Sequence, residues 1–277
     1  MGLRINTNIA SLAAMRTLSN TKSALDGTLE RLSSGSRINR AGDDAAGLAI
    51  SENLRATIRG FRQAKRNAQD GISMIQVTEG GLNEISNMII RLRELAIQAA
   101  SDTIGNKERS FTDREFQALK SEMQRIADST NFNGNPLLNG KAGIFEIQVG
   151  VNNNPLSDRI VYNAENANVT LDTLGLVGES VATKVGAQTT LSALDESLMK
   201  VNSVRADLGA MQNRLQSTTN SLAISDENLS AANSRIRDAD LAQEVSEMTK
   251  QNILMQAGIS VLGQANNQAQ AALKLLS

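Results

Sequence analysis

Side chains that could carry catalytic chemistry are scarce in this sequence. It contains no histidine and no cysteine, and Tyr162 is its only tyrosine. Imidazole acid–base catalysis, thiolate nucleophiles and cysteine–histidine zinc sites are therefore excluded. Carboxylates, lysines and hydroxyls remain, but their spacing forms no cluster typical of a divalent-cation site. We expect a protein that is not an enzyme and needs no cofactor or metal; the alternative is an enzyme that uses lysine or carboxylates in the middle of the chain.

Two short motifs resemble functional sites without meeting their requirements. The stretch 134–141 resembles a phosphate-binding loop, but its glycines are one residue too far apart and Ala142 stands where Ser or Thr would hold magnesium. Asn168-Val169-Thr170 fits a glycosylation sequon, a pattern that arises often by chance. We assign no function to either.

The charge balance and the hydropathy pattern limit the partners. The 277 residues carry 28 basic and 29 acidic side chains, so no net field attracts nucleic acid or anionic lipid. No apolar run reaches the length of about 18 residues that a membrane span needs. The first eight residues also lack the apolar core of a secretory signal peptide. We expect no nucleic-acid partner, no membrane insertion and no cleaved signal peptide.

The hydrophobic residues are almost all aliphatic, which suits helices packed on helices. Hydrophobic residues make up 40% of the chain and aromatic residues only 2%, and the two prolines, Pro136 and Pro155, lie close together. An apolar seam of coiled-coil type runs from Ile5 through Met15 and Leu18 to Leu32. It ends at Gly35, and Asp43 and Asp44 predict the start of a long second helix.

That second helix and its successor carry weaker boundary signals. We expect the second helix to continue to about residue 100, with a phase slip at Gly80-Gly81. The polar stretch 101–110 predicts a loop. Thr112 and Glu115 have the spacing of a capping box, so the next helix is predicted to start there.

The middle of the chain is the only strand-like part. Phe145, Ile147 and Val149 alternate with polar residues, and 159–162 is the predicted return strand of a hairpin. The stretch 164–188 is small, polar and weakly patterned, so we expect loop and a short strand there.

The C-terminal third carries the strongest periodicity. Apolar residues recur at every seventh position from Leu194 to Ile236. The phase changes at 238–240, and a new seam runs from Leu241 to Leu276. Beyond Lys250 the only charged side chain is Lys274. A solvated helix would carry charges on its outer face, so this one is predicted to have neighbours on several sides.

Two arrangements would give the terminal helices the neighbours that their apolar faces need. Copies of the chain can join head to tail into an open helical filament, with the termini as coiled coils inside and the hairpin outside. Alternatively, the two termini pair with each other in a single-chain bundle. Periodicity alone does not decide between them.

Several segments, in order along about 1–145 and 190–277, resemble the signatures of bacterial flagellin. They are INTN (5–8), LSSG (32–35), RIN (37–39), DDAAGLAIS (43–51), RNAQDGIS (66–73), RELA (93–96), FNG (132–134), SRIRDAD (234–240) and QAN (264–266).

The resemblance implies a mainly α fold, in which long coiled-coil helices from both termini form a bundle with a small β-hairpin region at about 140–190. It implies three segments: an inner coiled-coil segment with a connecting spoke (1–44), an outer helical domain (45–236) and a C-terminal inner helix (237–277). The implied function is that of a structural subunit that self-assembles into the flagellar filament used for swimming. The alternative is a hook-associated junction protein of the same family. The short middle implies a short form without large variable outer domains.

The resemblance also implies sites and partners. The implied partners are other copies of the chain, an export chaperone and assembly factors on the C-terminal segment, cap and hook-junction proteins, and the Toll-like receptor that senses flagellin. The implied location is the extracellular filament, reached by type III export without a cleaved signal. Ile90 departs from the Gln common in strongly recognised members. Three sites are implied. The residues that pack in the filament core are Leu18, Leu25, Leu29, Leu32, Met255, Ile259, Leu262, Leu273 and Leu276, and the spoke residues are Arg37, Asp43, Asp44, Arg237, Asp238 and Asp240. The face that the receptor would recognise consists of Arg91, Leu95 and Glu115.

Overall fold

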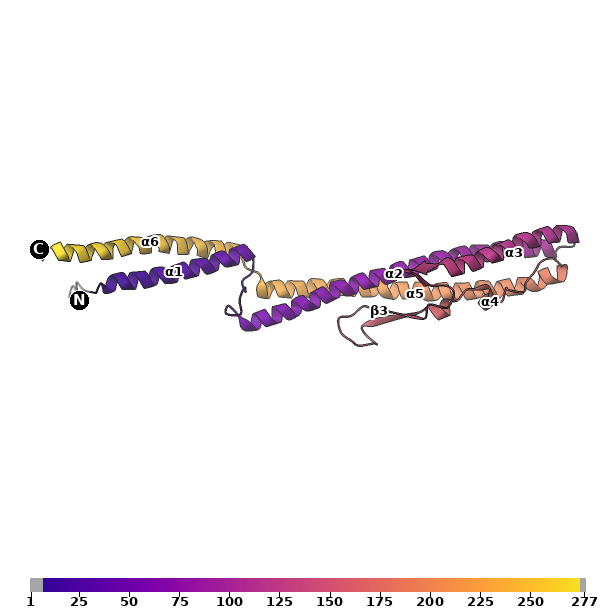
Figure 1. Ribbon diagram of the computed structural model, residues 1–277, viewed down its shortest axis with the longest axis horizontal. Coiled ribbons are helices and arrows are strands. Elements are labelled where there is room, and N and C mark those ends of the chain that lie inside the picture. Colours follow the sequence, from indigo (N-terminus) through magenta and orange to yellow (C-terminus); the bar gives the residue numbers. More distant parts are fainter. Residues whose placement is uncertain (1–6, 275–277) are drawn as a thin grey trace. The chain divides into compact units, whose positions relative to one another are not determined.

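The computed structural model describes residues 7–274, with side chains for 7–267. Ile5 and Leu276 lie outside the described residues, and the side chain of Leu273 is likewise not described. The chain divides into a terminal unit, Met1–Ala56 with Asn228–Ser277, and a central unit, Thr57–Glu227. The elements are long helices with two small hairpins between α3 and α4, as Figure 1 shows. The predicted fold class, mainly α with a small hairpin region, is confirmed.

The terminal unit pairs the two ends of the chain. Helix α1 (Ile9–Ser34) lies along α6 (Leu241–Lys274). The Asn8 side chain caps α1 by accepting from the Ser11 N–H at 3.1 Å, and Gly35 ends the helix in the left-handed conformation with φ 67°. Asp240 caps α6 through the Ala242 N–H at 2.9 Å. Local sequence therefore fixes where both helices begin and where α1 ends.

The division into units does not coincide with the predicted segments. Helices α2 (Ala45–Ala100) and α5 (Lys184–Arg237) each contribute to both units, because the unit boundaries fall inside them. The predicted boundaries at 44/45 and 236/237 fall instead at or next to helix ends. The functional division into 1–44, 45–236 and 237–277 stays a prediction.

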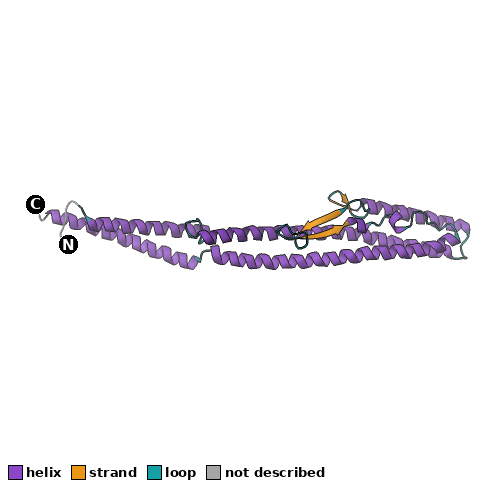
Figure 2. Cartoon of the chain, turned by 90° about the horizontal axis from the view of Figure 1, so that it is seen from below, coloured by secondary structure: helices purple, strands orange, loops and turns teal. Residues whose placement is uncertain are grey.

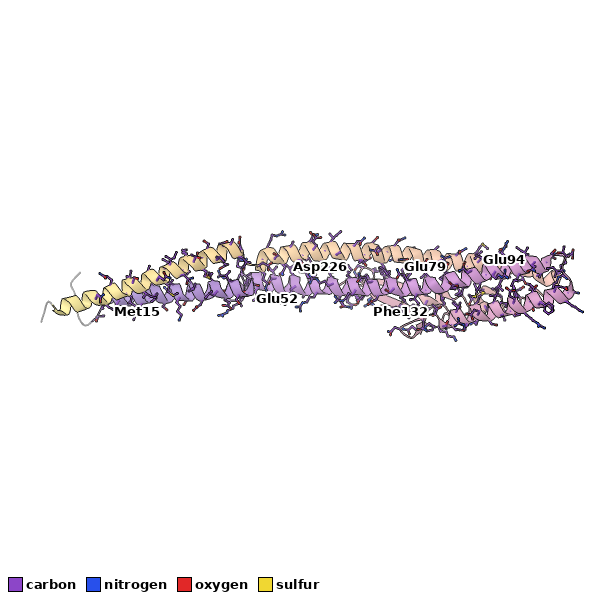
Figure 3. The ribbon with its side chains drawn as sticks, turned by 90° about the horizontal axis from the view of Figure 1, so that it is seen from above. Met15, Glu52, Glu79, Glu94, Phe132 and Asp226 are labelled. Atoms are coloured by element: carbon purple, nitrogen blue, oxygen red, sulfur yellow. The ribbon has the colours of Figure 1, made fainter. Side chains whose placement is uncertain are left out.

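The core of the central unit is built on the heptad pattern of α5. Five of its predicted seam residues are at most 8% exposed: Leu194, Val201, Leu208, Leu215 and Leu222. Helix α2 supplies fully buried residues to the same core, among them Ile75, Leu82, Ile85, Ile89 and Leu92. Two ion pairs fix α2 and α5 as antiparallel neighbours, Arg62 with Asp226 at 3.0 Å and Arg93 with Asp195 at 2.8 Å (Figure 3 labels Asp226).

The predicted phase slip at Gly80-Gly81 is wrong, because the buried residues of α2 continue in steps of three and four through both glycines, at Ile75, Thr78, Leu82, Ile85 and Ile89. Gly81 serves close packing instead. A Cβ atom placed on it would lie 2.7 Å from Oγ1 of Thr130 and 2.8 Å from Cδ1 of Leu138. The chain after α3 crosses α2 at this point, and only a residue without a side chain leaves room for it.

The predicted capping box at Thr112 is also wrong. Helix α3 (Asn106–Ser129) starts before it, and the Thr112 hydroxyl lies inside the helix, where it donates to the Glu108 carbonyl. Arg109 explains the early start. Its side chain is 7% exposed and donates to the carbonyl oxygens of Ala99 at 2.8 Å and Ser101 at 2.9 Å. The guanidinium satisfies acceptors at the end of α2 and so stabilises the first turns of α3.

Two antiparallel hairpins follow α3, drawn in orange in Figure 2. Strands β1 (Asn131–Phe132) and β2 (Asn135–Pro136) turn at Asn133 and Gly134, with φ of 50° and 81°. Strands β3 (Ile144–Gln148) and β4 (Arg159–Asn163) form the predicted hairpin, with Phe145 opposite Tyr162 and their rings stacked at 6.0 Å. The period-two pattern predicted this hairpin correctly.

The stretch 164–188 contains no strand, in contrast to the prediction. It forms a 3₁₀ turn at Ala164–Ala167, the short helix α4 (Leu171–Leu174) and the start of α5. Side chains of α3 hold it in place. The buried Lys120 donates to the carbonyls of Val177 at 3.1 Å and Glu179 at 2.8 Å, and the Asp113 carboxylate accepts from the Val181 N–H at 2.8 Å. These long-range bonds replace the strand pairing that we expected.

Candidate functional site

Among the residues that the structure describes, no group of three carboxylates, histidines or cysteines could hold a metal ion. Within the same part of the chain, no helix combines the length and the hydrophobicity needed to cross a membrane. The phosphate-loop resemblance also fails, because Leu137 and Leu138 in it are fully buried. The features that remain are surfaces.

The first surface is the seam between α1 and α6. On α1 Leu25 is buried and Leu18 and Leu32 are half-buried, and on α6 Met255 and Leu262 are half-buried; all five are predicted core-packing residues. Smaller residues fill the rest of the seam, including the buried Thr28. The pair is joined at both ends, by Asn8 Nδ2 donating to the Ala265 carbonyl at 3.0 Å and by an Arg31–Glu244 ion pair at 3.4 Å. These predicted residues therefore pack within one chain.

The other heptad position of α1 is not used by this seam. Met15 is 55% exposed and Leu29 is 45% exposed, although each lies within four residues of a seam leucine. Leu29 and Ile259 are thus the predicted core-packing residues, among those whose side chains are described, that remain exposed. The sequence offered two apolar heptad positions, and pairing with a single helix buries only one of them.

The exposed aliphatic surface of the terminal unit is extensive. It consists of Ile9, Leu12, Met15 and Leu29 on α1 and of Leu241, Val245, Ile253, Leu254, Ile259 and Val261 on α6, each between 45% and 64% exposed. At 100° per residue, Leu241, Val245 and Ile259 lie on one flank of the α6 seam and Leu254 and Val261 on the other. No charged residue occurs from 251 to 267. Helix α6 is therefore apolar on several sides, and α1 covers one of them.

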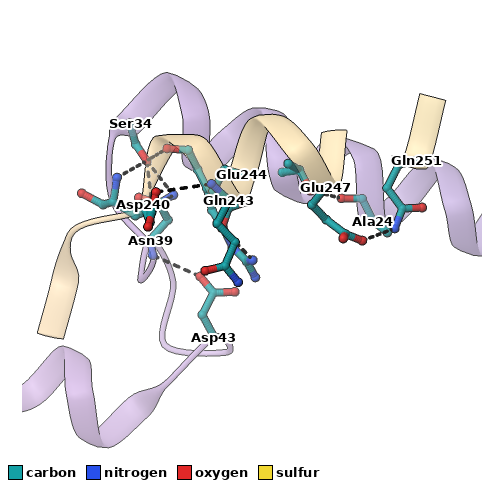
Figure 4. Close-up of polar contacts among 12 residues, drawn as sticks. Ala24, Ser34, Asn39, Asp43, Asp240, Gln243, Glu244, Glu247 and Gln251 are labelled. Carbon is teal, nitrogen blue, oxygen red and sulfur yellow. Dashed lines mark hydrogen bonds and ion pairs between the residues drawn. The ribbon is translucent and has the colours of Figure 1, made fainter. Parts of the chain in front are cut away.

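The two connecting segments meet each other, as Figure 4 shows in part. Ser36 and Asp238 form an isolated β-bridge, and the Ala239 N–H donates to the Gly35 carbonyl at 3.0 Å. Arg37 donates through its backbone N–H to the Arg237 carbonyl at 2.6 Å and through Nη2 to the Ile236 carbonyl at 2.8 Å. The structure thus brings together spoke residues from opposite ends of the sequence.

The acidic spoke residues have local structural roles. The Asp43 carboxylate accepts from the backbone N–H groups of Arg40 and Asn39, both at 3.0 Å, and these bonds lower the pKa of Asp43. Asp44 accepts from the Gly47 N–H at 2.8 Å and so caps α2.

Three further residues, Ile38, Gly47 and Glu52, complete the joint, and none of them is among the predicted spoke residues. Ile38 is 1% exposed, and its Cδ1 lies 2.8 Å from the position of a Cβ on Gly47. Glu52 accepts a short hydrogen bond from Arg237, which lowers the pKa of Glu52. A lone isoleucine in the polar stretch Arg37-Ile38-Asn39-Arg40 is the signal that could have indicated a small core here.

The predicted receptor face divides into exposed and buried residues. Arg91 pairs with Glu115 at 2.9 Å and with Glu94 at 2.8 Å, and all three are exposed. Leu95 is 2% exposed and belongs to the hydrophobic core, so its side chain is not available at an exposed face. Glu115 joins α3 to α2 through Arg91 and has no capping role.

Comparison with known proteins agrees with this architecture. Residues 5–142 match the bacterial flagellin N-terminal helical region, and residues 191–276 match the bacterial flagellin C-terminal helical region. The chain is 45% identical over 272 residues to a flagellin of Halalkalibacterium halodurans, covering 98% of this chain and 99% of the relative. It is 42% identical over 283 residues to a flagellar filament 30.7 kDa core protein of Treponema maltophilum, covering 99% of both chains.

A solved structure supports the same assignment. The crystal structure of Bacillus cereus flagellin is similar with a TM-score of 0.51 and 31% identity, covering 57% of this chain and 88% of that one. The sequence signatures, the paired terminal helices and the full-length relatives lead to one family. The chain belongs to the bacterial flagellins.

Proposed function

We propose that copies of this chain pack against one another through the aliphatic surface that α1 and α6 leave exposed. As a flagellin, the chain is a structural subunit of the flagellar filament. The hook-associated alternative is not favoured, because filament proteins match the chain over nearly its full length.

The observation that carries the proposal is the apolar, uncharged character of α6 outside its seam with α1. Apolar patches of this extent on a soluble chain mark interaction sites, because their exposure to water is unfavourable. Since the exposed residues lie on both flanks of the seam, one additional neighbour cannot cover them all. Contacts between different patches of identical chains generate an open helical array. A filament core made of many terminal units would cover the exposed residues on both flanks of the seam.

The proposal assigns the predicted residues to two groups. Leu18, Leu25, Leu32, Met255 and Leu262 hold α1 to α6 within one copy and so set the spacing of the exposed side chains. Leu29 and Ile259 make contacts between copies.

The spoke joint has a related role in the proposal. The β-bridge of Ser36 and Asp238 and the bonds of Arg37 tie the two connecting segments together, next to α1 and α6. A fixed joint limits the orientations that α1 and α6 can adopt together, which lowers the entropy cost of assembly.

Further partners follow from the family and remain part of the proposal. The exposed aliphatic surface of α6 is a suitable binding surface for an export chaperone, since it must be covered before assembly. We also propose that the chain is exported by the type III route without a cleaved signal and contacts cap and hook-junction proteins at the filament ends. Recognition by the receptor would use Arg91 and Glu115. We propose no catalytic activity.

Seeded polymerisation tests the proposal. The full chain is added to short filament fragments and imaged by electron microscopy, beside the variant Ile259→Asp. Wild type is expected to elongate into long filaments, whereas the variant stays monomeric with unchanged helical circular dichroism, because Ile259 is 56% exposed and outside the seam. Normal filaments from Ile259→Asp would contradict the assignment of this surface.

A further inference from the structure

The most exposed large hydrophobic side chain of the described residues lies in the central unit. Leu156, in the loop between β3 and β4, is 95% exposed. The loop around it is cross-linked by hydrogen bonds. Asp158 accepts from the Asn154 N–H through Oδ2 at 3.0 Å and donates its own N–H to the Asn154 carbonyl at 2.9 Å, and the Leu156 N–H donates to Asn154 Oδ1 at 3.0 Å. The loop therefore holds a leucine in solvent in a fixed position.

A polar groove with an unpaired cation lies beside this leucine. The groove has a volume of about 410 Å³ and is lined by Leu156, Ser157 and Arg159 of the hairpin and by Arg214, Ser217 and Thr218 of α5. The Arg214 guanidinium makes no ion pair or hydrogen bond within the described part of the chain, and Arg214 is exposed. We call Leu156 and Arg214 the knob patch. Its complement would be an apolar hollow beside a carboxylate.

The same chain carries such a hollow. A cavity of about 220 Å³ between β4 and α5 is lined by Val161, Val204, Leu208 and Met211, with Asp207 also on its lining. Asp207 is exposed, and its carboxylate forms no ion pair with any described residue. Val161 is 46% exposed, so the hollow opens to solvent. We call Val161, Val204, Met211 and Asp207 the cavity patch.

We propose that Leu156 of one copy enters the cavity patch of a second copy, with Arg214 of the first beside Asp207 of the second. The inference rests on the proposed self-assembly and specifies a contact between central units. Charge complementarity selects the occupant, because each patch combines an apolar element with one unpaired charge of opposite sign. The two patches are distinct sites of one chain, so each copy can insert its Leu156 into one neighbour and receive Leu156 from another, as a contact that repeats from copy to copy requires. The rigid loop lowers the ordering cost of insertion.

Cross-linking between copies tests the contact directly, since the natural chain has no cysteine. Equal amounts of Leu156→Cys and Val204→Cys chains are co-polymerised, oxidised and separated without reductant. Covalent dimers are expected in the mixed filaments and not in filaments of either variant alone. Mixed filaments without dimers would overturn the proposal.

Charge exchange and a matched apolar control provide the second test. Asp207→Arg and Arg214→Asp are each expected to slow seeded growth, and the double variant, which restores opposite charges, is expected to recover it. Leu156→Asp should raise the critical concentration about tenfold or more. Ile144→Asp, at 61% exposure on the same hairpin, should change it little. Wild-type growth of Leu156→Asp would refute this contact while leaving the filament function intact, whereas failure of wild type to polymerise would refute the function itself.

Discussion

Replacing Ile253 by alanine isolates the contribution of the exposed α6 surface to assembly. The side chain is 61% exposed and lies outside the seam with α1. Complete burial of an isoleucine stabilises by about 1.5–3 kcal/mol, so covering the exposed part in a filament contributes roughly 0.9–1.8 kcal/mol. Loss of that contribution raises the critical concentration about four- to twentyfold, at 1.4 kcal/mol per factor of ten. Alanine is the best helix former, so a weaker α6 helix would not explain the effect.

The assay is the monomer concentration that remains after seeded growth and sedimentation of filaments. Ile224→Ala is the matched control, because Ile224 is also a helical isoleucine, with 60% exposure, and lies on α5 of the central unit. It removes the same exposed atoms outside the proposed surface and should leave the critical concentration near that of wild type. Equal values for Ile253→Ala and wild type would refute the reasoning that α6 is covered by neighbouring copies.

Two further predictions concern the central unit. Gly81→Ala should lower the free energy of unfolding by about 1–3 kcal/mol, because the added Cβ would overlap with Thr130 and Leu138. Gly80→Ala is the control and should be neutral or stabilising, because no atom lies within 4 Å of its added Cβ. Thermal unfolding followed by circular dichroism measures both variants, and equal melting temperatures would contradict the close packing at Gly81. Burial raises the pKa of Tyr162 from 10.0 to about 12, so the folded state retains this proton longer than the unfolded state and stability should fall as pH rises from about 10 to 12. Absorbance of the only tyrosinate reports this titration, Tyr162→Phe should reduce the loss of stability over this pH range, and ionisation near pH 10 in the folded protein would contradict the prediction.

The features that periodicity determines were predictable from the sequence. The heptads of α5 gave the core residues from Leu194 to Leu222, and the alternation around Phe145 gave the hairpin. The break at Gly35 and the cap at Asp44 were readable because each depends on a few adjacent residues. Local rules were sufficient wherever the stabilising partner lies within one or two helical turns.

The errors all concern positions whose partner is distant in sequence. Thr112 has the spacing of a cap, but Arg109 starts α3 earlier by binding carbonyls at the end of α2. The pair Gly80-Gly81 suggests a phase slip of the seam, although the register continues and Gly81 provides room for Leu138. On α1, the sequence could not distinguish Leu18, which faces α6, from Met15, which does not, because both positions are apolar and only the partner helix decides.

Hydrogen exchange of the same chain as dilute monomer and as filament tests the central claim most directly. Helix α1 contains only Leu25 and Thr28 as buried residues, whereas the central unit has a continuous core. We predict rapid amide exchange in α1 and α6 of the monomer, strong protection of both helices in the filament, and protection of the central unit in both states. Full protection of α1 and α6 in the dilute monomer would contradict it, because those helices would then be stable without neighbouring copies.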